Sequence, residues 1–177
     1  MRIISGKHKG LTLKPPKTLK ARPTTDIAKE GLFNILANRF DFENVTILDL
    51  FAGTGSISYE FASRGCKSIH LVEMDFKHFA FIRKTITELK LNAITPIRYD
   101  AYKFLKNCTL QFDIIFADPP YDIKGIENIP DIVFTNNLLK NNGLLIIEHS
   151  KKTNISENSH YVETRSYGNV HFSLFKS

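Results

Sequence analysis

The sequence has 177 residues, of which 42% are hydrophobic, and a formal net charge of +6 at pH 7. This length suits one α/β domain with a proper core, and no apolar run approaches the length of a membrane span. Two cysteines, Cys66 and Cys108, and scattered histidines lack the spacing of a metal site. With no apolar leader after the basic N-terminal residues, we expect a cytoplasmic protein with neither metal nor membrane partners.

The positive charge is concentrated at the N-terminus. Residues 1–25 contain seven lysines and arginines and no acid, so the rest of the chain has a formal charge of −1. Apolar pairs flank the segment 6–10, which begins and ends with glycine and therefore predicts a short hairpin with a basic tip. A charged end is often only a solvated tail, but an ordered basic hairpin suits contacts with phosphates. We divide the chain into a basic hairpin and linker, residues 1–23, and an α/β domain, residues 24–177.

The first helix is predicted from Thr24 to Arg39. Pro23 stands just before it, and apolar residues recur on one face. Thr24, Thr25 or Asp26 could cap its N-terminus.

A strand that breaks into a glycine turn and then enters a helix follows. Thr46–Leu50 is an apolar run with one carboxylate, Asp49, near its end. Gly53 and Gly55 permit a tight turn and the close approach of a ligand. Ser56 is predicted to cap the helix at 57–64, whose free N–H groups favour anionic or polar ligand atoms. A lone Gly-x-Gly motif is weak evidence, because an ordinary strand–turn–helix has the same pattern.

The remaining chain alternates between strands and helices. The predicted strands are 68–72, 95–99, 112–117 and 143–148, and a terminal hairpin joins strands 160–165 and 170–175. The predicted helices are 75–91, which Asp75 is expected to cap, 102–107 and a part of 126–140. This alternation predicts a doubly wound, mostly parallel sheet with ligands at the carboxyl ends of its strands. Four acids fall at those ends: Asp49, Glu73, Asp100 and Asp118.

Glu73 stands where a doubly wound sheet places an acid that reaches a ribose hydroxyl. The nicotinamide version of this fingerprint needs a third glycine, but position 58 is a serine. A dinucleotide site is therefore disfavoured.

The motif Asp118–Pro–Pro–Tyr121 follows the predicted strand 112–117. Together with the loop 49–55, Glu73 and Asp100, it resembles S-adenosylmethionine-dependent methyltransferases that methylate amino groups. The chain as a whole resembles the RsmD family of bacterial 16S rRNA guanine-N2 methyltransferases. The matching segments are residues 2–6, 10–13, 22–26, 30–34 and 167–168.

The resemblance implies a Rossmann-like domain that binds S-adenosylmethionine and methylates a guanine of 16S rRNA, either free or within an assembled small-subunit particle. It implies that Glu73 accepts from the ribose hydroxyls, that Asp100 accepts from the adenine amino group, and that Asp49 lies near the ammonium end. The other implied cofactor residues are Phe51, Ala52, Gly53, Gly55, Met74 and Ala101.

The implied catalytic residues are Asp118, Pro119, Pro120 and Tyr121. An exocyclic amine is a poor nucleophile because its lone pair is delocalised into the base. Asp118 and the Pro119 carbonyl would accept its two N–H hydrogens, which positions the nitrogen and stabilises its developing charge. The prolines stiffen the loop, and Tyr121 offers an aromatic face to a flipped base. For the tetrapeptide alone, a rigid turn is the alternative.

Substrate contacts are expected from the N-terminal part of the chain. Basic side chains there suit phosphates, while the resemblance suggests that the linker and helix start also close over the site. The predicted substrate residues are Arg2, Lys7, Lys9, Arg22, Thr24 and Thr25. For the last three a helix cap is the simpler interpretation.

Other functions share parts of this pattern. A DNA adenine-N6 methyltransferase uses the same tetrapeptide but usually carries a target-recognition domain, for which this chain has no room. A protein-glutamine methyltransferase typically has asparagine where Asp118 stands. Another RNA amino-methyltransferase, or a silent RNA-binding module that retains the cofactor fold, completes the alternatives. The intact set of acids argues against the silent module.

Overall fold

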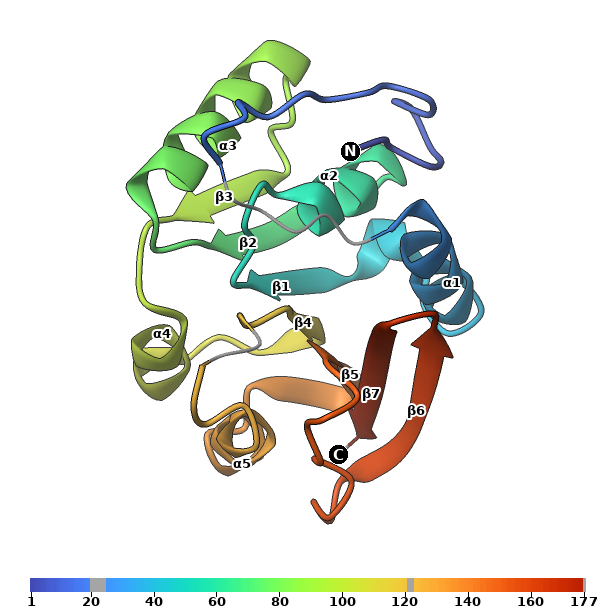
Figure 1. The fold of residues 1–177 in the computed structure, drawn as a ribbon, viewed down its shortest axis with the longest axis vertical. Coiled ribbons are helices and arrows are strands. Elements are labelled where there is room, and N and C mark those ends of the chain that lie inside the picture. Colours follow the sequence, from blue (N-terminus) through green and yellow to red (C-terminus); the bar gives the residue numbers. More distant parts are fainter. Residues whose placement is uncertain (20–24, 121–122, 177) are drawn as a thin grey trace.

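The computed structural model describes residues 1–19, 25–120 and 123–176, and its centre is a seven-stranded sheet in the order β3-β2-β1-β4-β5-β7-β6 (Figure 1). The strands are β1 (Thr46–Leu50), β2 (Ser68–Val72), β3 (Ile94–Ile97), β4 (Phe112–Ala117), β5 (Leu139–His149), β6 (Tyr161–Tyr167) and β7 (Val170–Lys176). Strands β1 to β5 pair in parallel, while β7 is antiparallel to both of its neighbours. The predicted doubly wound sheet with a C-terminal hairpin is confirmed.

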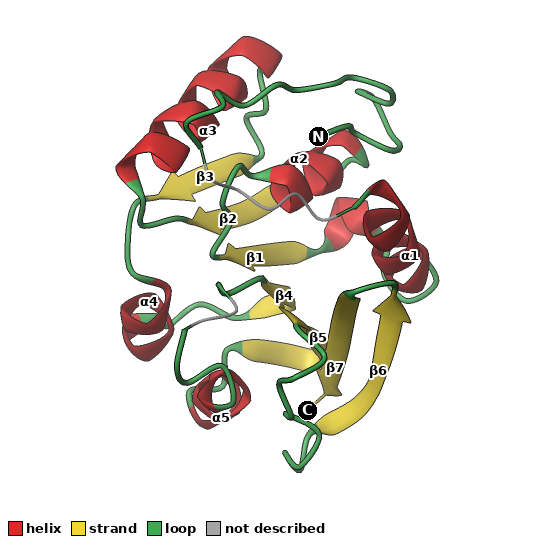
Figure 2. Ribbon diagram, in the orientation of Figure 1, coloured by secondary structure: helices red, strands yellow, loops and turns green. Residues whose placement is uncertain are grey.

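Helices cover both faces of the sheet (Figure 2). They are α1 (Asp26–Ala37), α2 (Ser56–Ser63), α3 (Phe76–Leu89), α4 (Ala101–Asn107) and α5 (Asn128–Thr135), with a short 3-10 turn η1 (Phe42–Asn44) before β1. One core cluster joins the sheet to α1, α2 and α3, and a second joins it to α4 and α5. Successive β1 residues, Ile47 and Leu48, enter opposite clusters, which explains why the central strands are nearly continuous apolar runs.

The end of β3 and the start of β5 differ from their predictions. Strand β3 ends at Ile97 and not at position 99, because Asp100 starts the next helix by accepting a hydrogen bond from the Lys103 N–H at 2.8 Å. Strand β5 begins at Leu139, earlier than predicted, because Leu139 already pairs with Phe112 of β4. The register then shifts, and regular pairing resumes where Leu144 meets Ile114. Asn142, which lies between these two pairs, adopts a left-handed φ of 63°.

The helix starts confirm two caps and contradict a third. Thr25 caps α1 by accepting from the Ala28 N–H, and Asp75 caps α3. The predicted cap Ser56 is wrong, because it is the first residue of α2 and Gly55 holds the cap position without a side-chain bond. Gly55 needs its left-handed φ of 83°, and a Cβ there would lie 2.7 Å from the ring of Tyr59.

The N-terminal residues form the predicted hairpin, although only Arg2 and Thr12 make a β-bridge. The tip leaves the ladder to contact the end of α2, where the Lys7 N–H donates to the Ser63 carbonyl at 2.7 Å. Ile3 is 2% exposed and belongs to the same core cluster as α1 and α2. The hairpin is therefore packed onto the sheet domain and is not a solvated tail.

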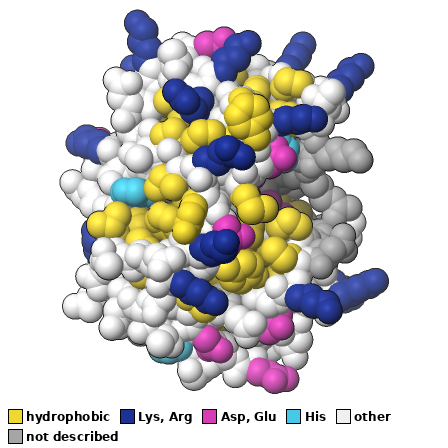
Figure 3. Space-filling view, turned by 90° about the vertical axis from the view of Figure 1, so that its left-hand side faces the viewer, with side chains coloured by type: hydrophobic (Ala, Val, Ile, Leu, Met, Phe, Trp, Pro, Cys, Tyr) yellow, Lys and Arg dark blue, Asp and Glu magenta, His cyan; other side chains and the backbone are white. Residues whose placement is uncertain are grey.

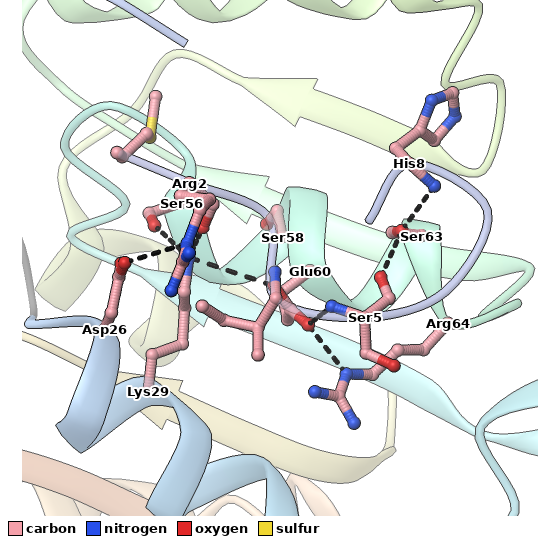
Figure 4. A network of polar contacts seen from close by, with 12 residues as sticks. Arg2, Ser5, His8, Asp26, Lys29, Ser56, Ser58, Glu60, Ser63 and Arg64 are labelled. Carbon is pink, nitrogen blue, oxygen red and sulfur yellow. Dashed lines mark hydrogen bonds and ion pairs between the residues drawn. The ribbon is translucent and has the colours of Figure 1, made fainter. Parts of the chain in front are cut away.

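A buried charge network holds this hairpin in place (Figure 4). The Glu60 carboxylate accepts from the N–H groups of Ile4 at 2.7 Å and Ser5 at 3.0 Å. The Lys29 ammonium lies 3.8 Å from Glu60 and donates to the Arg2 carbonyl and to Ser56 Oγ. Both side chains are at most 1% exposed, and burial lowers the pKa of Lys29 despite the attraction of Glu60. One network thus joins the hairpin, α1 and the start of α2.

Replacing Lys29 by methionine should lower the free energy of unfolding by about 3 kcal/mol, because it leaves the Glu60 charge buried with one fewer partner. Urea denaturation measures this change. Lys67→Met is the matched control, since its ion pair with Glu43 is 71% and 63% exposed, and it should cost no more than about 1 kcal/mol. Equal effects of the two substitutions would show that the buried network does not hold the hairpin.

Candidate active site

The candidate site lies at the carboxyl edge of the parallel strands. Leu50 at the end of β1 is paired with Val72 of β2 on one side and Ala117 of β4 on the other. The residues that follow these three strands, the glycine loop, Glu73 and Asp118, are therefore neighbours. The sheet order reverses between β1 and β4, and such switch points form ligand crevices in doubly wound sheets.

Figure 3 shows the side of the molecule toward which the arrows of β1, β2 and β3 point in Figure 1. Hydrophobic side chains gather on this face, with acidic groups among them and lysine and arginine side chains around them. A ligand at the carboxyl edge would therefore meet apolar surface as well as charge.

The glycine loop, residues 51–55, contains a strained residue, Phe51, and has open space on the flank of Gly53. Phe51 has a positive φ of 56°, which is unusual for a residue with a side chain. Its ring makes an edge contact with Tyr102 at 5.7 Å between centroids. A Cβ on Gly53 would meet only the Phe51 carbonyl at 3.9 Å, so a ligand can approach the backbone closely at this point.

Glu73 ties the glycine loop to the start of α3. Its Oε2 accepts from the Gly53 N–H and its Oε1 from the Asp75 N–H, both at 2.7 Å, and the residue is 8% exposed. A carboxylate has about four acceptor sites, so these two bonds leave capacity for ribose hydroxyls.

Asp49 is 1% exposed beneath the same loop. It accepts from Ser58 twice, from the backbone N–H at 3.2 Å and from Oγ at 2.6 Å. Burial and, to a lesser extent, the charge of Glu73 raise the pKa of Asp49 to about 7 against the opposing effect of the Ser58 bonds. In the sequence, Ser58 stands out only as a serine at the position of a third glycine. The only feature of the sequence that could have indicated its bond to Asp49 is a small hydroxyl residue in the first turn of the helix after the loop.

The predicted adenine-binding residues come together after β2 and β3, which are paired at Val72 and Ile97. Met74 is 62% exposed and Ala101 is buried. Asp100 is half-buried and caps α4, so its role toward adenine stays a prediction. Tyr99 was not predicted as a site residue, yet it is 44% exposed beside Asp100 because β3 ends early.

The Asp118 loop lies beside the glycine loop, because the Asp118 N–H donates to the Leu50 carbonyl at 3.4 Å. Asp118 is half-buried, Pro119 is buried and Pro120 is exposed. Tyr121 lies outside the described residues.

The predicted substrate residues are not all at this edge. Lys7 and Lys9 are exposed at the hairpin tip, which contacts the last residue of α2. The glycine loop lies at the other end of this helix, just before its first residue. Eight helical residues separate the two ends by about 12 Å. Arg2 pairs with Asp26 at 3.0 Å. Thr25 acts as a cap, and Arg22 and Thr24 lie outside the described residues.

Residues 1–19, 25–120 and 123–176 contain no group of three or more His, Cys, Asp or Glu side chains that could hold a metal ion. Within the same part of the chain no helix is both long and apolar enough to cross a membrane.

Comparison with known proteins identifies the class. The solved structure of a putative methyltransferase, yhhF, from Escherichia coli matches with a TM-score of 0.85 and 28% identity, over 99% of this chain and 96% of that one. The chain is 31% identical to ribosomal RNA small subunit methyltransferase D of Buchnera aphidicola subsp. Baizongia pistaciae, over 99% of this chain and 91% of the relative. It is 32% identical to putative rRNA methyltransferase YlbH of Bacillus subtilis, over 99% and 98%.

The fold and its carboxyl edge thus define a Rossmann-like methyltransferase. The family model described as conserved hypothetical protein 95 matches residues 1–176. The chain belongs to this family, the RsmD family of methyltransferases, and the resemblance seen in its motifs is confirmed.

The raised pKa of Asp49 predicts that a ligand with an ammonium group releases a proton when it binds. A cation near Asp49 favours the carboxylate, so at pH 6 S-adenosylhomocysteine should release a proton on binding. Its affinity should rise about tenfold between pH 6 and pH 8. Calorimetry in buffers of different ionisation enthalpy measures the released proton. In the free protein the same shift lowers the unfolding free energy as pH rises from about 4 to about 7, because the unfolded chain binds fewer protons.

Asp49→Asn should abolish the proton release, whereas Asp41→Asn, at the opposite edge of the sheet, should keep it. Release that persists in Asp49→Asn would assign the proton to another group.

Proposed function

We propose that this protein transfers the methyl group of S-adenosylmethionine to the exocyclic N2 amine of a guanine in 16S rRNA. The observation that carries the proposal is the pairing of β4 with β1, which sets Asp118 beside the glycine loop. The full-length similarity to proteins named ribosomal RNA small subunit methyltransferase D supports RNA as the substrate class.

The residues present fit this cofactor. The open flank of Gly53 leaves room for a ligand chain against the backbone, and a buried acid with a raised pKa, Asp49, suits an ammonium group. Glu73 would accept from the ribose hydroxyls, and Met74 and Ala101 would contact adenine near Asp100. Phe51 and Ala52 would position the loop backbone. When bound, S-adenosylmethionine supplies a methyl group activated by a sulfonium.

Asp118 would act on the target amine. Its carboxylate and the Pro119 carbonyl would accept the two N–H hydrogens, which orients the nitrogen lone pair toward the methyl donor. The same carboxylate would stabilise the positive charge that develops on the nitrogen. Pro120 would keep the loop rigid, and the ring of Tyr121 would stack on the extruded base.

The basic hairpin and linker, residues 1–23, would hold the RNA, while residues 24–177 carry the reaction. Arg2, Lys7 and Lys9 would contact phosphates, and Arg22, Thr24 and Thr25 would close over the base. The substrate would be 16S rRNA, free or within an assembled small-subunit particle, and the reaction would take place in the cytoplasm where ribosomes are built.

Transfer of labelled methyl groups tests the proposal. The protein is incubated with naked 16S rRNA, with small-subunit particles from cells that lack the activity, and with adenine-containing duplex DNA. Mass mapping should find N2-methylguanine at one position of the rRNA. Methyladenine in DNA would establish the DNA alternative. RNA binding without any turnover would establish a silent binding module.

Asp118→Ala should reduce the single-turnover rate by about 10²–10³-fold, because it removes a preorganised electrostatic contact. S-adenosylhomocysteine affinity should change little, since Asp118 faces the base. Asp118→Asn separates positioning of the amine from stabilisation of its charge, because asparagine keeps the shape and one acceptor oxygen but lacks the negative charge. Retained activity would mean that positioning dominates. Asp41→Ala, at the opposite edge, is the control, and wild-type turnover in Asp118→Ala would remove this residue from the mechanism.

Neutralising Lys7, Lys9 and Lys14 together should weaken RNA binding and reduce its dependence on salt. Each lost phosphate contact lowers the slope of log affinity against log salt by about 0.7–0.9. Filter binding between 50 and 200 mM salt, roughly the range in which such contacts show, measures the slope. The matched control replaces three exposed lysines on the other half of the sheet: Lys151, Lys152 and Lys176. Equal slopes in the two triple variants would show that the hairpin is only a solvated face.

A further inference from the structure

A groove on the outer side of α3 is not used by the proposed reaction. Its volume is about 750 Å³, and it is lined by Phe76, Phe79, Arg83, Lys84 and Arg98 among others. The α3 residues follow one stripe of the helix, and Arg98 comes from the loop just after β3. In Figure 3, hydrophobic side chains in the upper part of the face are surrounded by lysine and arginine side chains.

The groove presents an exposed aromatic ring. Among the described residues, three of the six exposed large hydrophobic side chains follow β2 or β3: Met74, Phe76 and Tyr99. Met74 and Tyr99 flank the proposed adenine site, but Phe76 faces the groove. It is 65% exposed even though the Arg98 guanidinium lies 5.2 Å from its ring centroid. The ring therefore already accepts one planar group and has most of its surface available for another.

The groove is also positively charged. Lys84 has a partner in Glu88 at 3.7 Å, but both side chains are largely exposed. Within the described part of the chain, neither Arg83 nor Arg98 has a carboxylate within ion-pair distance, and Arg98 makes only a long bond to the Met74 carbonyl at 3.4 Å. An aromatic ring beside uncompensated arginines is the combination that single-stranded nucleic acids bind, with bases on the ring and phosphates on the cations.

The groove lies on the same edge of the molecule as the reaction. Arg98 follows β3 and Asp118 follows β4, and these strands are separated in the sheet by β2 and β1. Three steps of about 4.8 Å give roughly 14 Å between the two strand ends. A few nucleotides of an extended strand can span this distance. Enzymes that modify a base extrude it from the stack, which leaves neighbouring nucleotides unpaired.

We propose that this groove binds an unpaired nucleotide of the substrate RNA close to the target base. Its base stacks on Phe76, and its flanking phosphates contact Arg83 and Arg98. The inference rests on the proposed function in taking RNA as the substrate. It adds a second RNA contact on the opposite side of the cofactor site from the Asp118 loop.

The test measures RNA binding without turnover, so that it does not depend on methyl transfer. The probes are a fluorescent single-stranded oligoribonucleotide of mixed sequence and the same strand in a duplex, followed by anisotropy on the full chain. The single strand should bind more tightly than the duplex. Phe76→Ala should weaken single-strand binding about tenfold, within the range for a lost stacking contact. Phe76→Tyr should retain the affinity, because it keeps the ring.

The double variant Arg83→Ala/Arg98→Ala should lower the salt slope for single strands by about 1.4, or about 0.7 per cation. Leu110→Ala is the control for an exposed apolar side chain, and Lys151→Ala/Lys152→Ala is the control for two exposed cations. Neither control should change binding, and all variants should bind S-adenosylhomocysteine as the wild type does.

Wild-type RNA affinity in both Phe76→Ala and the double arginine variant would overturn the proposal. Weaker S-adenosylhomocysteine binding in Phe76→Ala with unchanged RNA binding would overturn it too, by assigning the groove to the cofactor. Loss of affinity for small-subunit particles only, with oligoribonucleotide binding intact, would instead assign the groove to a protein partner. Binding that depends on Phe76 in a protein that methylates no RNA would refute the proposed function and support the groove.

Discussion

The position of β1 between two parallel partners determines that the glycine loop, Glu73 and Asp118 lie side by side. Hydrogen bonding to β2 and β4 on its two sides brings three strand ends to one edge, and chemistry-bearing loops follow each of them. Parallel pairing is possible here because both faces of the sheet are covered by helices, so the central strands can be apolar throughout. A shift in the register of β1 against β4 would separate the glycine loop from Asp118.

The two carboxylates beneath the glycine loop have different surroundings and therefore different properties. Glu73 accepts hydrogen bonds from two backbone N–H groups, and these bonds hold the loop against the start of α3. Asp49 is more deeply buried and accepts only from Ser58, so desolvation dominates and its pKa rises. One acid thus supports the loop geometry, while the other is ready to ionise when a cation arrives. The acidic cofactor edge is bordered by the basic groove on α3, which suits a cationic cofactor and a polyanionic substrate that bind side by side.

The buried pair of Lys29 and Glu60 connects the N-terminal hairpin to this edge. Glu60 holds the hairpin backbone through Ile4 and Ser5, and Lys29 reaches the first residue of α2 at Ser56 Oγ. Ser56 directly follows the glycine loop, so the hairpin, α1 and the loop share one set of polar contacts. Ion pairs of this kind contribute little net stability over apolar residues, but loss of either partner leaves the other charge buried without its counter-charge.

The sequence by itself determined the order of the elements, the parallel sheet, the terminal hairpin and the acids at the strand ends, because these depend on local periodicity and on turn residues. Thr25 and Asp75 were predictable caps, since a cap is a local hydrogen bond. The resemblance to the RsmD family rests on short, contiguous motifs that can be read directly from the sequence, and the family model confirms it.

Only the tertiary structure decided the features that depend on contacts between distant residues. The failure of Ser56 as a cap follows from the left-handed turn at Gly55 beneath Tyr59, and the length of β5 follows from its register with β4. The pairing of Lys29 with Glu60 and the raised pKa of Asp49 arise from burial, which no local pattern specifies. The groove on α3 likewise exists because β3 stops early and leaves Arg98 beside Phe76, two residues that are 22 positions apart in the chain.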